Sequence, residues 1–171
     1  GMICIKISDC TQLETEAIMQ NKYQQKYTEI FQQIGDHAKL VLATSLNNKV
    51  SARTMSFVIL EGSLYFQTDK EMRKYQDIKG NPNVTLCFSN IQLEGICEEI
   101  GRPIEHEDFC RLFQQHFPSS FEAYSQLPNE RLFVVRPTFI QRWSYINGSP
   151  MIERLYLHEK QYHEEVYLND D

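Results

Sequence analysis

Three short apolar runs separated by turn residues, between Ala38 and Thr68, limit most strongly what this chain can fold into. The first run, AKLVLATSL, ends at the turn NNK. The second, Val50–Leu60, ends at EGS, which leads into the third, LYFQT. Runs of this length, broken by Asn and Gly, are typical of β-strands joined by tight turns. The sequence therefore predicts an antiparallel meander of three strands.

More strand-like segments follow the meander. VTLCFS and IQLEGICEEI are joined at Asn90, and RLFVVRP and TFIQRWSYI are predicted as two strands with Pro137 as the break between them. The count is about seven short antiparallel strands with a few helices. This pattern predicts a small closed or partly closed barrel of α+β class.

Helices are predicted before and between these strands. TQLE, Thr11–Glu14, has the form of a capping box, and an apolar face after it extends to Ile34. Two further helices are predicted, KEMRKYQDIK and a segment that starts near Pro103, and PSSFEAYSQL is a possible third. We expect one domain over residues 1–171, with a helix at 12–34, the barrel at about 36–145 and a C-terminal tail at 150–171. In the tail IERLYL is a possible strand, and the acidic end is predicted to fray.

Composition excludes several classes of function. A chain of 171 residues with 42% apolar residues can bury one conventional core, and its net charge of −6 argues against nucleic-acid and anionic-membrane partners. Five widely spaced cysteines and the absence of an apolar run of about 18 residues favour a cytoplasmic protein with free thiols. The alternative for Cys87 and Cys97, which lie in neighbouring predicted strands, is that they face each other. His158 and His163 have poor spacing for a shared ligand, so no metal site is predicted.

Arg53 is the unusual residue of the second run. In a strand it shares one face with Met55, Phe57 and Ile59, so its charge lies against an apolar surface. A charge in such a place needs an anionic partner, because burying it alone costs several kcal/mol. The partner is either a carboxylate of the protein or the anion of a ligand.

A second segment points to a ligand. TDKE, from Thr68, also has the form of a capping box, which predicts that Thr68 or Asp69 caps the helix that carries Arg73 and Lys74. The amides and partial positive charge of a helix N-terminus suit a phosphate group. Together with Arg53 these residues predict a phosphate site, and ordinary surface ion pairs remain the alternative.

The order of motifs ATSL, SARTMSFV, LYFQT, MRK, NPNVTLCF and LEG resembles the FMN-binding split barrel of pyridoxamine 5′-phosphate oxidase-like proteins, over roughly residues 35–145. The resemblance implies a mainly β, α+β fold: an antiparallel Greek-key split β-barrel with flanking helices. It also implies a homodimer with FMN at the subunit interface.

The resemblance assigns cofactor contacts residue by residue. It places Arg53 and Lys74 on the phosphate or ribityl end of FMN, with Thr68 and Arg73 beside them. Other contacts that it implies are the backbone of Thr54, Met55 and Ser56 at the pyrimidine edge of the flavin, and Gln67, Asn90 and Trp143 near the ring system.

Three departures from the family pattern narrow the expected activity. Met72 stands in place of a serine before the basic pair, and Val58 in place of a basic residue. RLYLH, Arg154–His158, is a degenerate form of the oxidase's C-terminal signature. These departures argue against pyridoxamine 5′-phosphate oxidase activity itself and favour the general stress protein-like branch.

The expected function is an FMN-dependent oxidoreductase that acts on a small-molecule substrate, with no catalytic side chain assigned. A second hypothesis is a non-catalytic module that binds flavin, haem or another ligand. A third is a dimeric structural protein without a cofactor, in which Arg53 pairs with an acidic neighbour.

Overall fold

The computed structural model describes residues 7–168. The helices are α1 (Ile7–Ile34), α2 (Arg73–Gly80), α3 (Glu107–His116) and α4 (Pro118–Tyr124), with a short 3₁₀ turn at Pro103–Glu105. The strands are β1 (His37–Leu46), β2 (Lys49–Leu60), β3 (Ser63–Asp69), β4 (Asn83–Phe88), β5 (Ile91–Glu99), β6 (Glu130–Ile146), β7 (Ser149–Tyr156) and β8 (Gln161–Val166). No helix in the described range is long and apolar enough to cross a membrane.

Six of the strands close into a barrel. The strands pair in the order β3-β2-β1-β4-β5-β6, and an additional pairing of β3 with β6 closes the ring. All of these pairings are antiparallel, and β4 lies beside β1 instead of β3, the Greek-key arrangement. The predicted mainly β, α+β split-barrel fold is confirmed, and so is the meander of β1, β2 and β3.

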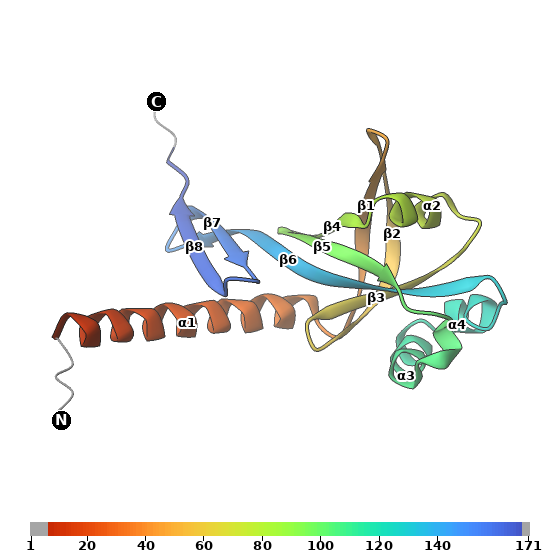
Figure 1. Cartoon of the computed structure of the whole chain (residues 1–171), viewed down its shortest axis with the longest axis horizontal. Coiled ribbons are helices and arrows are strands. Elements are labelled where there is room, and N and C mark those ends of the chain that lie inside the picture. The colour runs from red at the N-terminus through yellow and green to blue at the C-terminus, as the bar shows by residue number, and fades with distance from the viewer. Residues whose placement is uncertain (1–6, 169–171) are drawn as a thin grey trace, which may run out of the picture.

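The possible strand IERLYL is confirmed, because most of it lies in β7, whereas the acidic segment predicted to fray forms a further strand up to Val166. Residues 149–166 form β7 and β8, which extend the sheet beyond β6. Figure 1 shows this hairpin beside α1, whose N-terminal half projects away from the barrel. The last part of the predicted frayed end, residues 169–171, lies outside the described residues.

The predicted break at Pro137 is also wrong, because β6 runs without interruption past it. Glu94 pairs with Phe139 and the next residue, Gly95, pairs with Pro137, so Thr138 is an extra residue in β6. This is a β-bulge, which accommodates a proline inside a strand. A Cβ at Gly95 would lie 2.7 Å from the carbonyl oxygen of Arg136, so glycine permits the close approach of the two strands.

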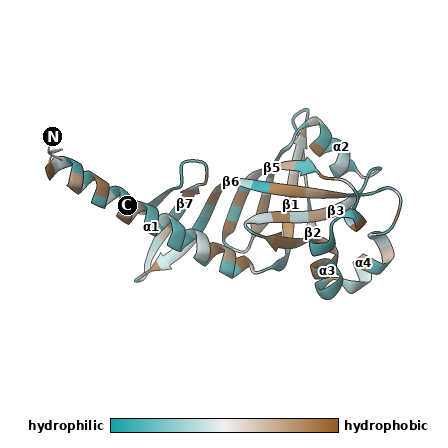
Figure 2. Cartoon of the chain, turned by 60° about the horizontal axis from the view of Figure 1, so that its bottom comes forward, coloured by the Kyte–Doolittle hydropathy of each residue, from teal (hydrophilic) through white to brown (hydrophobic). Residues whose placement is uncertain are grey.

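Helix α1 begins earlier than its predicted capping box. Thr11 lies inside the helix and its hydroxyl donates to the carbonyl oxygen of Ile7 at 2.8 Å, the i−4 bond open to a threonine within a helix. Only the C-terminal half of α1 contributes buried residues, Tyr23, Ile30 and Ile34. In Figure 2 hydrophilic and hydrophobic residues are mixed along the projecting half.

Stacked aromatic rings fill the barrel. Phe57 and Phe66 lie 5.3 Å apart between ring centroids, and Phe66 stacks on Phe133 at the same distance. All three side chains are fully buried. A second, smaller cluster on the outside of β2 and β6 joins Val58 and Leu132 to Phe109 and Phe113 of α3.

The turn between β2 and β3 is fixed by α1. Glu61 and Gly62 both have positive φ, the conformation of a tight hairpin turn. A Cβ on Gly62 would lie 1.9 Å from the hydroxyl of Tyr27 in α1. Glycine at this position therefore allows the helix to pack directly over the turn.

The described cysteines, Cys10, Cys87, Cys97 and Cys110, are all free thiols. Cys87 of β4 is exposed and pairs in register with Gln92, whereas Cys97 of β5 is buried. The two therefore do not face each other across the neighbouring strands.

Candidate functional site

Arg53 lies on the face of β2 that carries Phe57, and its side chain is half-buried. Its guanidinium donates to the hydroxyl of Thr44 at 2.9 Å and to the hydroxyl of Ser51. A longer contact of 3.4 Å reaches the carbonyl oxygen of Leu42. Within residues 7–168 Arg53 forms no direct ion pair, so a protein carboxylate does not neutralise it by contact.

Asp77 of α2 lies behind the two hydroxyls that hold Arg53. Its carboxylate is buried and accepts hydrogen bonds from Thr44 at 2.8 Å and from Ser51 at 3.3 Å. Thr44 and Ser51 are partners in the register of β1 and β2, which places both hydroxyls at one point. Asp77 therefore orients Arg53 through these hydroxyls. Sequence reasoning missed it, although its i+4 spacing from Arg73 on a predicted helix was visible.

Lys74 and Thr68 meet beside this group. The Lys74 ammonium donates to the Thr68 hydroxyl at 3.3 Å, and Thr68 is buried while Lys74 is half-buried. Burial and then the nearby charge of Arg53 lower the pKa of Lys74, while Glu130 acts in the opposite direction. Arg53 and Lys74 are therefore close enough to repel each other.

Arg73 adds a third cation. Its guanidinium lies 3.8 Å from the carboxylate of Asp77. Burial lowers the pKa of Arg53, Asp77 raises it, and the charge of Arg73 lowers it again. We refer to Arg53, Arg73 and Lys74 as the cationic cluster.

Glu130 is the other carboxylate near the cluster. It lies opposite Asp69 in the pairing of β3 with β6 and is 5% exposed. Burial and the negative charge of Asp69 raise its pKa to about 7, against the effect of Lys74. At neutral pH Glu130 is thus only partly ionised, and the cationic cluster keeps an excess of positive charge.

The N-terminus of α2 is not built as predicted. The helix begins at Arg73 with Met72 as the N-cap, and no side chain caps it. Thr68 remains in β3, and Asp69 accepts a hydrogen bond from the backbone N–H of Glu71 in the preceding turn. The predicted cap by Thr68 or Asp69 is therefore wrong, because three residues separate Asp69 from the first helical residue. The first amides of α2 remain without a side-chain cap.

Gln67 lies on the opposite face of β3 from Thr68. It is buried, and its amide oxygen accepts a 2.7 Å hydrogen bond from the Ser125 hydroxyl that follows α4. The structure therefore does not bring its side chain to the cationic cluster.

In β2, Met55 packs against the core near Arg53, while the exposed Thr54 and half-buried Ser56 face outward.

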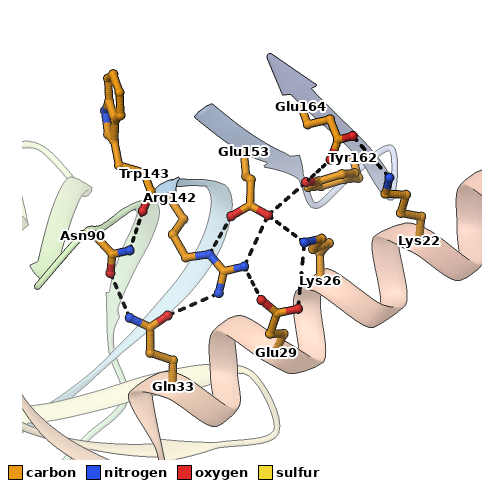
Figure 3. A network of polar contacts seen from close by, with 10 residues as sticks. All are labelled: Lys22, Lys26, Glu29, Gln33, Asn90, Arg142, Trp143, Glu153, Tyr162 and Glu164. Carbon is orange, nitrogen blue, oxygen red and sulfur yellow. Dashed lines mark hydrogen bonds and ion pairs between the residues drawn. The ribbon is translucent and has the colours of Figure 1, made fainter. Parts of the chain in front are cut away.

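Asn90 and Trp143 lie together in a second polar region (Figure 3). The Asn90 side chain donates to the carbonyl oxygen of Trp143 and accepts from Gln33 of α1 at 2.8 Å. The Trp143 ring is 40% exposed and lies 5.5 Å from the ring of Tyr167. None of these bonds reaches the cationic cluster.

A buried ionic network next to Asn90 fastens the outer strands to α1 (Figure 3). Glu153 is fully buried and accepts from Arg142 at 2.7 Å, from Lys26 at 2.8 Å and from Tyr162 at 3.0 Å. Arg142 also pairs with Glu29 of α1. Burial alone would raise the pKa of Glu153, but the bonds from Arg142 and Lys26 lower it to about 2.

These features define a split-barrel protein with a cationic cluster formed by residues of β2 and α2. The family model for pyridoxamine 5′-phosphate oxidase matches residues 25–144, most of the chain. The chain belongs to this family, which confirms the resemblance predicted from its motifs. A search of curated proteins found no match.

Solved structures with a similar fold carry different functional descriptions. General Stress Protein 26 from Bacillus anthracis is 26% identical, with 68% of this chain and 89% of that chain covered and a TM-score of 0.52. A pyridoxamine 5′-phosphate oxidase-related, FMN-binding protein from Nostoc punctiforme is 18% identical, with coverages of 80% and 89% and a TM-score of 0.53. HutZ, the haem storage protein of Vibrio cholerae, is 17% identical, with coverages of 64% and 87% and a TM-score of 0.51.

Proposed function

We propose that this chain binds FMN and uses it as an oxidoreductase on a small-molecule substrate. The observation that carries the proposal is the cationic cluster. Three cations lie around one buried carboxylate, Asp77, and a second carboxylate that is only partly ionised, Glu130. On a chain of net charge −6, such a local excess of positive charge needs an anion.

The donors present fit the phosphate of FMN. A guanidinium offers a planar pair of N–H donors, an ammonium a compact charge and Thr68 a hydroxyl. The first amides of α2, which no side chain caps, are further donors for an anion. A bound phosphate would also relieve the repulsion that lowers the pKa of Lys74. The side chains of Arg53, Thr68, Arg73 and Lys74 thus form the proposed phosphate site.

The remaining predicted contacts complete the proposed site. The backbone of Thr54, Met55 and Ser56 is proposed for the pyrimidine edge of the ring. Gln67 stays a predicted ring contact, which requires its side chain to exchange Ser125 for the flavin.

A homodimer accounts for the separation of the site residues into two groups. Asn90 and Trp143 hydrogen-bond within a network distinct from the cationic cluster of the same chain. We propose that they contribute to the cleft of a second copy, with FMN at the subunit interface. Val41, Val50 and Ile96, which are exposed on outward faces of barrel strands, support a second copy as their cover.

Bound FMN supplies the hydride or electron transfer, through its ring N5. The chain's own residues bind and orient the cofactor, and none is assigned as an acid or base. The free thiols of the described cysteines support a cytoplasmic location.

The test compares two double variants. Arg53→Ala/Lys74→Ala removes two members of the cationic cluster, whereas Lys79→Ala/Arg111→Ala removes the same charges from exposed positions. FMN affinity, followed by quenching of flavin fluorescence, is expected to fall by a few kcal/mol in the first variant only. Equal FMN affinities in the two variants would contradict the residue assignment. A colourless protein that gains no thermal stability from added FMN would remove the flavin proposal itself.

A non-catalytic module is the second candidate, favoured by Met72 and Val58, which leave the phosphate site short of one hydroxyl and one charge. HutZ shows that a protein of this fold is described as storing haem. Turnover assays with NADH or NADPH and a quinone or dye acceptor distinguish the two candidates. Flavin or haem binding without turnover would support the module, and steady turnover the oxidoreductase.

A further inference from the structure

Three side chains with metal-binding atoms meet where α3 ends against the start of the barrel. Asp36 and His37 lie at the junction of α1 and β1, and His116 is the last residue of α3. One ligand atom from each lies within 4.8 Å of the other two. The two imidazole rings stack, with centroids 3.6 Å apart. This group is separate from the cationic cluster and from the network around Glu153.

His116 has a ring nitrogen with no hydrogen-bond partner. Its Nε2 atom is buried, and among residues 7–168 no acceptor or donor lies within hydrogen-bonding distance of it. The nearest carboxylate oxygen is that of Asp36, at 3.8 Å. A buried polar atom without a partner costs free energy, about 1–3 kcal/mol, so its retention needs a cause.

Two of the three spacings between the ligand atoms bracket the value expected around one metal ion, and the third pair lies within 4.8 Å. Tetrahedral zinc bonds to nitrogen and oxygen at about 2.0–2.2 Å, which separates neighbouring ligand atoms by roughly 3.3 Å. The Asp36 oxygen lies 2.7 Å from Nδ1 of His37 and 3.8 Å from Nε2 of His116, on either side of that value. A metal ion would replace the proton that the first pair now shares.

We propose that Asp36, His37 and His116 bind a divalent transition-metal ion of the zinc class, with water completing the coordination. Two imidazoles and one carboxylate are the ligand set that such ions prefer, whereas Mg²⁺ and Ca²⁺ prefer sites built of oxygen alone. With three protein ligands the metal keeps an open position.

The exposed partners allow the small movement that coordination needs. The stacked rings lie almost parallel, at 7°, and a shared metal requires their ligand atoms to converge. The side chains of Asp36 and His37 are 60% and 43% exposed, so they can turn toward the less exposed His116. The metal would fasten α3 to the beginning of β1.

The experiment uses the full chain without an affinity tag, freed of metal by a chelator. Calorimetric titration with ZnCl₂ is expected to show one ion per chain, and Co²⁺ the visible absorption of a tetrahedral site. At a zinc concentration 100 times Kd, the Tm should rise by about 5–10 °C, because only the folded state holds the three ligands together.

Two double variants locate the ion. His37→Gln/His116→Gln is expected to lose at least 100-fold in zinc affinity, and Asp36→Asn at least 10-fold. His158→Gln/His163→Gln, which removes two histidines of the C-terminal region, should bind zinc as the wild type does. Circular dichroism verifies that each variant is folded.

Other outcomes overturn the proposal. Binding weaker than about 100 μM in the wild type, or loss of binding only in the His158→Gln/His163→Gln variant, would do so. If the His37→Gln/His116→Gln variant fails to fold, Asp36→Asn decides, and unchanged zinc affinity in it would refute the site.

Discussion

Replacing Glu153 by glutamine is expected to destabilise the fold strongly. Glu153 is fully buried and is the common acceptor for Arg142, Lys26 and Tyr162. A neutral side chain leaves Arg142 and Lys26 with only the more exposed Glu29 as a counter-charge, and loss of one partner of a buried pair costs about 3–5 kcal/mol.

The pKa of Glu153 provides a second estimate of the stability that the Glu153→Gln variant loses. Its value falls from 4.5 to about 2 in the folded protein. At about 1.36 kcal/mol per pKa unit, this corresponds to about 3 kcal/mol of stability at neutral pH. The two estimates of the lost stability agree, and the expected decrease in Tm of the Glu153→Gln variant is roughly 6–20 °C.

The assay is urea unfolding of wild type and variant, followed by circular dichroism at several pH values. Because the folded pKa is depressed, this stabilisation is complete above pH 4.5 and is lost as the pH falls through 2. The stability difference should therefore be constant from pH 7 to about pH 5 and shrink below 4.5. Glu165→Gln, which breaks the exposed pair with Arg154, serves as the control and should cost at most about 1 kcal/mol.

Two results would refute this reasoning. One is a Glu153→Gln variant within about 1 kcal/mol of wild type at pH 7. The other is a stability difference that stays unchanged down to pH 2.5. Either would mean that Arg142 and Lys26 find other partners or water once the carboxylate is lost.

Two further predictions concern the β2–β3 turn and the cationic cluster. Gly62→Ala is expected to cost about 2 kcal/mol or more in urea unfolding, because φ is +77° and the new Cβ would overlap the Tyr27 hydroxyl. Adding Tyr27→Phe should restore part of that loss, and a loss under about 0.5 kcal/mol in the single variant would contradict the packing. The pKa of Glu130, about 7, predicts tighter FMN binding at pH 6 than at pH 8, since protonation removes a negative charge beside Lys74. Glu130→Gln should reduce this pH dependence in a fluorescence titration. Identical pH profiles of FMN affinity in the wild type and the variant would contradict this role of Glu130.

The barrel could be predicted because its signals are local. Alternation along β1, β2 and β3, with turn residues between them, fixes both the strands and the faces of their side chains. The same alternation placed Arg53 on one face of the strand with Met55, Phe57 and Ile59. The short path through β3 to α2 brought Thr68 and Lys74 beside it, so part of the candidate site followed from spacing.

The errors arose where a local pattern has two possible outcomes. A Thr-x-x-Glu segment at Thr11 is compatible with a helix start and with a helix interior, and burial elsewhere decides between them. Thr68 belongs to β3 because its neighbours pair with β6, a contact between segments far apart in sequence. Pro137 indicates a break only if the partner strand cannot accommodate it. Here Gly95 in β5 accommodates the proline, so the strand continues.

Other parts of the structure depend on contacts across the whole chain. Glu153 looks like a solvent-exposed residue in the sequence, and only the approach of α1 explains its burial. Asp77 and Ser125 likewise acquire their roles from partners more than 20 residues away. No short-range pattern contains this information.

The network around Arg142 also affects the order in which the chain folds. Glu29 of α1 and Arg142 of β6 are 113 residues apart. At a synthesis rate of about 5–20 residues per second, Arg142 is synthesised roughly 6–23 s after Glu29 of α1. During that interval the apolar side chains of Tyr23, Ile30 and Ile34 lack the part of their core cluster that β6, β7 and β8 supply. We therefore expect α1 to dock last, and a nascent chain halted before β6 to require a chaperone to remain soluble.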